Sequence, residues 1–442
     1  MNADRQARDT EFEALVTDIP GPRSRSLAHA LRAVETRGVT YLARDFPIFW
    51  ESGRGALVTD VDGNRYIDAT AAFGVATTGH ANLAVARAVA EQAARLPHGM
   101  GDVHPTAVKV RLLEALAAIA PFPEARSFLC SSGAESVEFA LKTALLATGK
   151  PNALAFEGAY HGLSYGALEV GGLGKFREPW RAQLRDAAHF VAYPDVRDAG
   201  SLERALAATE ATLRADANIG AAIVEPILGR AGVIVPPPGF LSGLRALCTR
   251  YGALLIVDEI YTGFGRTGTM FECEREDVRP DVLCVGKALG GGFPISAAIA
   301  PAAIAAAWAP SNGEALHTST YLGNPMGCAA ALANLGEIRR LDIARVARER
   351  EPLFAARLLA LQRANDRVCD VRGRGMLWAV EFDDAGAASA CVVRALGHGL
   401  LLLQAGPEGR SVTFAPPPVI SDAQLARAFD LLGNAAAEAL PA

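Results

Sequence analysis

Three chemically reactive side chains each follow a short apolar run that has the character of a buried strand. Glu225 follows A-A-I-V, Asp258 follows L-L-I-V, and Lys287 follows V-L-C-V-G. Continuous apolar runs of this length are typical of strands that are buried on both faces of a parallel sheet. Ligands bind beyond the carboxyl ends of such strands. We therefore expect these side chains at one edge of a sheet, where a single ligand can meet all of them.

Lys287 lies in the glycine-rich segment V-G-K-A-L-G-G-G-F-P, and the chain has only five lysines. Glycines leave room for a flat ligand to approach the backbone. A lysine amine that is partly removed from water has a lowered pKa and can attack an aldehyde as a nucleophile. The alternative is a surface lysine after an edge strand, which the apolar run before it disfavours. Lys287 is thus the first candidate for a catalytic residue.

Two acidic residues, Asp258 and Glu259, end the second apolar run. The Asp258 carboxylate can pair with a protonated pyridine nitrogen and so keep such a ring an electron sink. Its alternative role is to cap the following loop. For Glu259 we expect a structural hydrogen bond or a contact between subunits.

A phosphate seat is predicted where Ser132, Gly133 and Ala134 precede an amphipathic helix. The first backbone N–H groups of a helix are free to bind an anion, and the small side chains at Gly133 and Ala134 do not obstruct them. Serine and glycine before a helix are also ordinary caps. Tyr160, in F-E-G-A-Y-H-G, lies in a glycine-flanked turn where its ring can stack on a planar ligand, although a single tyrosine there also fits a core position.

The elements that position these residues alternate between helix and strand from about residue 79. Two apolar helical faces are expected, formed by Val137, Ala140, Leu141, Ala144 and Leu145, and by Leu241, Leu244, Cys248 and Tyr251. Gly252 is predicted to cap the second helix, and Asn324 and Pro325 to open another. Residues 56–60 and 66–68 are predicted strands joined by an Asp-Gly turn. This alternation predicts an α/β fold with a mostly parallel sheet between helices.

The length of 442 residues exceeds what one hydrophobic core usually organises, so we expect two structural units. A flexible arm is predicted over residues 1–25 and a large domain over residues 79–335. A smaller α/β domain is predicted from residues 26–78 together with residues 336–442. After about residue 341 the pattern is helix, strand, helix, strand and helix, which is enough for this smaller domain.

The composition, 50% hydrophobic and 21% charged, is ordinary for a soluble globular protein. A net charge of -5 indicates neither a nucleic-acid partner nor an anionic membrane. The seven cysteines include no C-x-x-C pair, and no histidine stands at metal-ligand spacing, so we expect reduced buried thiols and no metal site. The charged N-terminus lacks the apolar stretch of a secretory signal, and residues 295–309 are too short an apolar run to span a bilayer. We expect a cytoplasmic protein.

Together these segments resemble the class III aminotransferases, which are pyridoxal-phosphate (PLP) enzymes of fold type I. The shared segments occur in the family's order and approximate spacing from about residue 25 to the end: V-D-G-N-R-Y-I-D, C-S-S-G-A-E-S-V-E-F-A-L-K, F-E-G-A-Y-H-G, I-V-E-P-I, I-V-D-E-I-Y-T-G-F-G-R-T-G, G-K-A-L-G-G-G-F-P, H-T-S-T-Y-L-G-N-P and V-R-G-R-G-M-L-W. The resemblance implies a large PLP-binding domain with a seven-stranded type of sheet. It also implies a ping-pong transaminase that moves an amino group from an amino acid or ω-amine to a 2-oxo acid or semialdehyde.

The resemblance assigns roles to the residues at the strand ends. Lys287 would form the Schiff base with pyridoxal 5′-phosphate and then shuttle the proton between the substrate α-carbon and the cofactor. Asp258 would hold the pyridinium nitrogen. The backbone N–H groups of Gly133 and Ala134, beside Ser132, would bind the phosphate.

Three further roles also come from the resemblance. Tyr160 would cover one face of the cofactor ring. Tyr261 stands where many relatives have glutamine beside the phenolic oxygen of the cofactor, and its phenol can donate the same hydrogen bond. Thr320, in S-T-Y-L-G-N-P, corresponds to a threonine that reaches the phosphate from the other subunit. That role implies an obligate homodimer with shared active sites.

Two departures from the family concern the substrate. Members that act on ornithine or γ-aminobutyrate usually grip a carboxylate with an arginine two residues before the C-terminal Pro-Pro, and a glutamate after V-E-P-I-Q-G masks it. Here Thr413 or Ala415 stands at the first place, with no arginine nearer than Arg410, and Arg230 stands at the second. Arg230 has either taken over the carboxylate, as a bidentate partner, or is solvated beside a site for amines or unusual amino acids. Glu225 is a further candidate for a substrate contact.

Two rival functions share some of these features. A racemase, epimerase or aminomutase of the same family would carry the same cofactor motifs. One enantiomer supplied without an oxo acid separates the two, because an isomerase turns over whereas a transaminase stalls after one half-reaction. A regulator that only binds PLP would need a DNA-reading module, and the N-terminal arm is too short for a winged helix.

Overall fold

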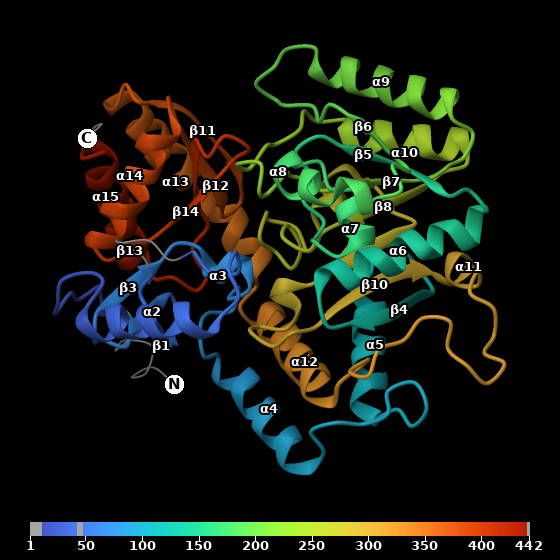
Figure 1. Ribbon diagram of the computed structural model, residues 1–442, viewed down its shortest axis with the longest axis horizontal. Helices are drawn as coiled ribbons and strands as arrows, with labels where there is room; N and C mark the ends of the chain where they lie inside the picture. The colour runs from blue at the N-terminus through green and yellow to red at the C-terminus, as the bar shows by residue number, and fades with distance from the viewer. Residues whose placement is uncertain (1–10, 42–46, 440–442) are drawn as a thin grey trace.

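The computed structural model describes residues 11–41 and 47–439 and shows two lobes side by side (Figure 1). Within the described residues the larger lobe holds a seven-stranded sheet in the order β4-β10-β9-β8-β7-β5-β6. Its strands are β4 (Ala125–Cys130), β5 (Asn152–Phe156), β6 (Ala188–Val191), β7 (Ile219–Val224), β8 (Leu254–Asp258), β9 (Val282–Val285) and β10 (Ser296–Pro301). Neighbouring strands are parallel except at β10, which runs antiparallel to β4 and β9. This mostly parallel sheet confirms the predicted fold class.

Helices cover both faces of this sheet. The helices of the larger lobe are α4 (Leu83–Arg95), α5 (Ala107–Ile119), α6 (Gly133–Thr148), α7 (Tyr165–Glu169), α8 (Gly174–Arg177), α9 (Ser201–Ala215), α10 (Phe240–Tyr251), α11 (Ala302–Ala305) and α12 (Pro325–Arg340). Along β8, Leu255 and Val257 join the apolar cluster that contains α10, whereas Ile256 packs with α6. Successive side chains of a strand alternate between faces. Asp258 therefore lies on the same face as Ile256, toward α6.

The predicted helix ends are present. Gly252 ends α10 with a φ of 63°, in the left-handed region that glycine tolerates. Asn324 caps α12 by accepting from the backbone N–H groups of Met326 and Gly327, and Pro325 takes the first helical position. These local signals confirm the helix boundaries that the sequence predicts.

The smaller lobe joins segments from both ends of the chain. Its elements are α2 (Pro22–Val34), β1 (Trp50–Arg54), β2 (Leu57–Asp60), β3 (Arg65–Asp68), α13 (Ile343–Ala364), β11 (Val368–Arg374), β12 (Leu377–Phe382), α14 (Ala385–Gly397), β13 (Leu400–Leu401), β14 (Leu403–Ala405), β15 (Ser411–Phe414) and α15 (Asp422–Ala437). β2 and β3 pair antiparallel as expected, and β3 pairs in parallel with β13. One apolar cluster contains Leu57 and Ile67 together with Phe354 and Phe414. This shared cluster supports our proposed domain division after residues 78 and 335.

Residues 1–10 of the expected flexible arm lie outside the described residues. The rest of that range lies against the smaller lobe, because Ala14 pairs with Arg65 and the Val16 N–H donates to Asn64 Oδ1 over 2.8 Å. Helix α2 then begins at Pro22, which the sequence analysis did not predict.

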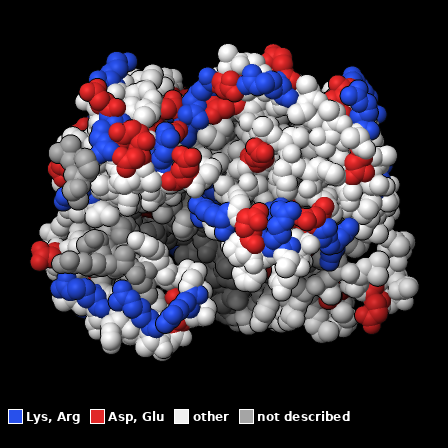
Figure 2. Space-filling view, turned by 45° about the horizontal axis from the view of Figure 1, so that its top comes forward, with Lys and Arg blue, Asp and Glu red and all other residues white. Residues whose placement is uncertain are grey.

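All seven cysteines lie in the described part of the chain, and none forms a disulfide. Six are buried, as expected, and Cys369 is exposed. On the face shown in Figure 2, acidic and basic residues are interspersed, and the surface is hollowed between the two lobes. Among residues 11–41 and 47–439, no helix is long and apolar enough to cross a bilayer.

Candidate active site

The three reactive side chains lie at the carboxyl ends of adjacent strands. Glu225 directly follows β7, Asp258 ends β8, and Lys287 begins a 3-10 turn two residues after β9. Both carboxylates act electrostatically on the Lys287 amine. The structure thus brings together the residues that the strand-end pattern predicts at one sheet edge.

Lys287 is held in an unfavourable backbone conformation with a φ of 41°, in the left-handed region that costs about 1 kcal/mol for a residue with a side chain. Removal from water lowers the pKa of its amine, and the Arg230 charge lowers the pKa further, while Asp258 and Glu225 oppose this change. Its Nζ lies 4.5 Å from the ring centroid of Tyr261. A desolvated amine of this kind has the properties of a nucleophile toward an aldehyde.

Asp258 is supported by a histidine that the sequence analysis missed. Oδ2 of Asp258 lies 2.8 Å from Nδ1 of His161, and Oδ1 accepts from the Ile260 N–H over 3.0 Å. Both side chains are buried, with exposed fractions of 4% and 2%. The Nε2 of His161 is buried without a partner among the described residues. The only signal in the sequence is that His161 follows Tyr160 in the turn after β5.

Glu225 connects two loops of the site. Its Oε1 accepts from the Tyr160 N–H over 2.7 Å and its Oε2 accepts from the Gly229 N–H over 3.1 Å. Burial raises the pKa of this carboxyl to about 7. Because both oxygens are engaged with backbone groups, the geometry favours a positioning role for Glu225 over the substrate contact that the sequence suggested.

Glu259 is turned into the protein interior. It accepts from the Cys273 N–H over 2.7 Å and from the Thr262 hydroxyl. Burial raises the pKa of its carboxyl to about 7. The structural hydrogen bond, one of the two alternatives for Glu259, is present.

The segment predicted to bind a phosphate forms the start of α6. Ser132 caps this helix by accepting from the Glu135 N–H, and the first N–H groups of a helix have no acceptor within it. A Cβ on Gly133 would lie 2.7 Å from Ile260 Cδ1, so the helix start packs closely against the loop after β8. The free N–H groups of the helix start, the buried Asp258 carboxylate and the desolvated Lys287 amine lie at one edge of the sheet. They fit the phosphate, the ring nitrogen and the aldehyde of PLP, respectively.

Tyr261 is wedged between two glycines. A Cβ on Gly74 would lie 2.4 Å from Tyr261 Cε2, and one on Gly229 would lie 2.4 Å from Tyr261 Cδ1. Gly74 ends α3 (Ala71–Gly74), in which all four residues have positive φ, namely 48°, 49°, 61° and 82°. This left-handed turn, which the sequence does not predict, therefore packs directly against the Tyr261 ring.

Arg230 lies at the exposed side of this site. Its guanidinium carbon is 5.1 Å from the Tyr160 ring centroid and 5.2 Å from that of Phe176. The two rings meet edge to face at 5.5 Å. Arg230 is therefore near the tyrosine that is expected to cover the ligand.

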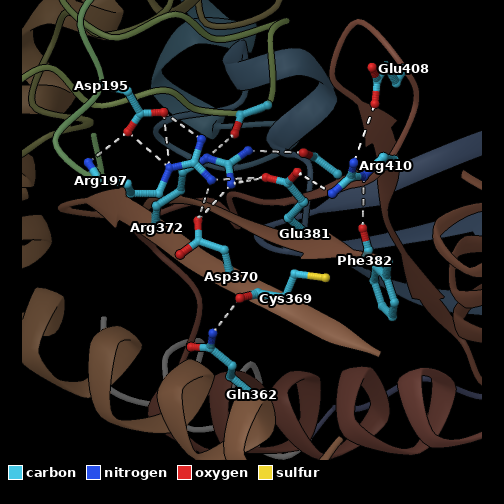
Figure 3. A network of polar contacts seen from close by, with 12 residues as sticks. Asp195, Arg197, Gln362, Cys369, Asp370, Arg372, Glu381, Phe382, Glu408 and Arg410 are labelled. Atoms are coloured by element: carbon cyan, nitrogen blue, oxygen red, sulfur yellow. Dashed lines mark hydrogen bonds and ion pairs between the residues drawn. The ribbon is translucent and has the colours of Figure 1, made fainter. Parts of the chain in front are cut away.

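A charged network anchors the loop that carries Arg230 (Figure 3). The buried Arg372 donates from Nε to the Gly232 carbonyl over 2.8 Å and pairs with Asp370 and Glu381. The Arg197 guanidinium, from the larger lobe, pairs with the same two carboxylates. The Arg230 carbonyl itself accepts from the Gly406 N–H over 2.9 Å. The smaller lobe thus holds this loop at two backbone carbonyls.

The C-terminal positions do not supply a second arginine to the site. Thr413 and Ala415 are buried in and after β15. Arg410 pairs with Glu381 over 3.1 Å in the network of Figure 3. Thr320 is exposed in the turn before α12.

Known proteins with a similar sequence and fold are aminotransferases. The aminotransferase class-III family model matches residues 41–436. The chain is 39% identical to acetylornithine aminotransferase of Methanopyrus kandleri over 88% of this chain and 94% of that protein. It is 37% identical to 4-aminobutyrate aminotransferase of Mycobacterium leprae over 95% and 97%. An amine transaminase from an uncultivated Pseudomonas species, solved with bound PLP, superimposes with a TM-score of 0.84 at 29% identity, over 92% of this chain and 98% of that one.

The fold and the residues at its sheet edge define an enzyme that depends on pyridoxal phosphate. The chain belongs to the class-III aminotransferase family, and its activity is PLP-dependent transfer of amino groups.

Proposed function

We propose that Lys287 is the amine that binds the cofactor covalently and that Asp258, held by His161, pairs with its ring nitrogen. When bound, pyridoxal phosphate would supply an aldehyde that reacts with amines and a ring that withdraws electrons from the adjacent carbon. The observation that carries this proposal is the placement of a desolvated amine and a buried carboxylate at the carboxyl ends of adjacent strands. When Lys287 is free, its Nζ is positioned to take the proton from the substrate carbon and to return it.

Other residues would orient the cofactor. The N–H groups of Gly133 and Ala134 would bind the phosphate beside Ser132, and the Tyr160 ring would cover one face. The Tyr261 phenol would donate to the phenolic oxygen, because its ring already lies 4.5 Å from Lys287 Nζ. These assignments extend the family's roles to the positions that match its motifs.

We also propose a homodimer in which Thr320 of each subunit reaches the phosphate in the partner's site. The exposed position of Thr320 supports this, since the side chain is free to meet a second subunit. A location in the cytoplasm stays a prediction from the sequence.

For substrates we propose an ω-amino acid or ω-amine as donor and a 2-oxo acid or semialdehyde as acceptor. Arg230 would bind a carboxylate, which is consistent with relatives named for acetylornithine and 4-aminobutyrate. The charge and position of Arg230 above Tyr160 support this role.

The test is the variant Lys287→Ala, assayed with a panel of amino donors and oxo-acid acceptors. We expect loss of turnover and of the visible absorbance of the lysine-bound cofactor, with the cofactor still bound at the phosphate seat. Full activity in this variant would refute the role of Lys287. Continued turnover of one enantiomer by the wild-type enzyme, without any oxo acid, would instead indicate an isomerase.

A further inference from the structure

Two cationic side chains share one aromatic ring at the exposed side of the site. The Nζ of Lys175, in α8, lies 5.2 Å from the ring centroid of Phe176. The guanidinium carbon of Arg230 lies 5.2 Å from the same centroid and 5.1 Å from that of Tyr160. Aromatic faces attract cations, so Phe176 and Tyr160 can hold both groups near each other.

Neither cation has an ion-pair partner within residues 11–41 and 47–439, whereas the arginines of the Figure 3 network all do. Burial lowers the pKa of the Lys175 amine, and the Arg230 charge lowers the pKa further. Two unpaired like charges that repel each other across one ring are stabilised when an anion binds between them.

The position of this pair relates it to the reaction. Arg230 lies 5.1 Å from the ring centroid of Tyr160, whose backbone N–H donates to Glu225 over 2.7 Å at the end of β7, next to the strand that ends in Asp258. An anion held between Lys175 and Arg230 would thus be at the end of a substrate remote from its reacting amine.

We infer that Lys175 and Arg230 together bind the remote carboxylate of the substrate, with Lys175 as a specificity-determining residue. The enzyme then prefers ω-amino acids to alkylamines of the same length. This inference rests on the proposed function of Lys287; it narrows the proposed donors to ω-amino acids and adds Lys175 as a second cation for their carboxylate.

The test compares 5-aminopentanoate with pentylamine, which differ only in the carboxylate, in the half-reaction of the holoenzyme. We expect Lys175→Met to lower kcat/KM for 5-aminopentanoate by about fivefold, the effect of one partly exposed charge, and to leave pentylamine within about twofold. Glutarate, which has no amine, should bind about fivefold more weakly to Lys175→Met in titration calorimetry. Lys175→Arg keeps the charge and should restore both values.

Lys142→Met is the matched control, because Lys142 is an exposed lysine that contacts His317 instead. It should leave all three measurements unchanged. Equal losses for both amines in Lys175→Met, or unchanged glutarate binding, would overturn the inference. So would a wild-type enzyme that shows no preference for 5-aminopentanoate. The absorbance of the lysine-bound cofactor is recorded in every variant: its absence from the wild-type enzyme would refute the proposed function, whereas its presence without a carboxylate preference would refute only this inference.

Discussion

At the scale of single residues, the site depends on buried polar groups that have defined partners. His161 fixes the Asp258 carboxylate, and Glu225 fixes the backbone of Tyr160 and Gly229. Buried polar groups are costly unless they are hydrogen-bonded, so these contacts orient the groups that we propose bind the cofactor. The preorganised partners allow a small number of side chains to define the chemistry.

Glu259 provides a test of this burial through pH. Its pKa is raised to about 7 in the folded protein, so the folded state binds a proton that the unfolded state, with a pKa near 4.5, releases. The contribution of Glu259 to stability is therefore complete below pH 4.5 and is lost as the pH rises through 7. Glutamine does not titrate, and its amide can accept from Cys273 and donate to Thr262.

We predict that the free energy of unfolding of Glu259→Gln, relative to that of the wild type, rises by on the order of 3 kcal/mol from pH 5 to pH 8. The thermal midpoints of both proteins, measured by calorimetry across this range, check the prediction. Other titrating groups cancel in the difference. A difference that stays constant with pH would show that Glu259 is ionised in the folded protein.

The residue scale also shows what the sequence could indicate. Lys287 and Asp258 were predicted because a buried strand leaves a clear apolar run, and its end marks the sheet edge. His161 was missed because no sequence periodicity or motif spacing distinguishes a single histidine beside a tyrosine from a histidine of the core. Its partner, Asp258, is 97 residues away in the sequence.

At the scale of elements, the left-handed turn α3 controls the position of Tyr261. We predict that Gly74→Ala lowers kcat by about tenfold or more, because the added methyl group would displace the Tyr261 ring from Lys287. Steady-state kinetics with any accepted donor check this.

Gly149→Ala is a matched control for backbone strain. Gly149 has a φ of 70° at the end of α6, and its Cβ would meet no atom of the described residues within 4 Å. It should cost about 1 kcal/mol of stability and keep kcat within about twofold. Equal kinetics in the two variants would contradict a steric role for Gly74.

The network of Figure 3 is the second element-scale feature. Arg372 is buried, and its loss would leave the Gly232 carbonyl without this donor and would remove one of the two arginines that pair with Asp370 and Glu381. We predict that Arg372→Ala lowers the free energy of unfolding by about 2 kcal/mol. Arg197→Ala, in a more exposed part of the same network, should cost less than about 1 kcal/mol. Denaturant midpoints compare them, and an equal loss in both would argue against the anchoring of this loop by Arg372.

The ends of helices could be predicted from the sequence where one or two capping residues determine them. Gly252 and the Asn324-Pro325 pair predicted helix ends, since caps depend on one or two residues. The reversed direction of β10 and the turn α3 could not be read in the same way. Strand direction depends on the path of the whole chain, and three residues with side chains in the left-handed region are stabilised only by tertiary packing.

At the scale of the whole molecule, the proposed dimer predicts complementation between defective subunits. A dimer of Lys287→Ala with Thr320→Asp would contain one site with both defects and one site with neither, if Thr320 acts across the interface. Differently tagged subunits allow the mixed dimer to be isolated. We predict that it has about half the wild-type activity, whereas both parent homodimers are impaired.

The mixed dimer also tests the alternative that Thr320 acts within its own subunit. If Thr320 acted in its own subunit, each site of the mixed dimer would keep one defect, and activity would not exceed the mean of the parents. A chain that sediments as a monomer while fully active would also contradict the proposed shared sites.

The central claim is that one particular amine carries the cofactor. Borohydride reduction of the holoenzyme makes this attachment permanent, and mass spectrometry of the digested protein then locates it. The sequence offers five lysines, namely Lys109, Lys142, Lys150, Lys175 and Lys287. We predict the phosphopyridoxyl group on the peptide that contains Lys287 and on no other. Attachment at any of the other four, or at none, would contradict the account.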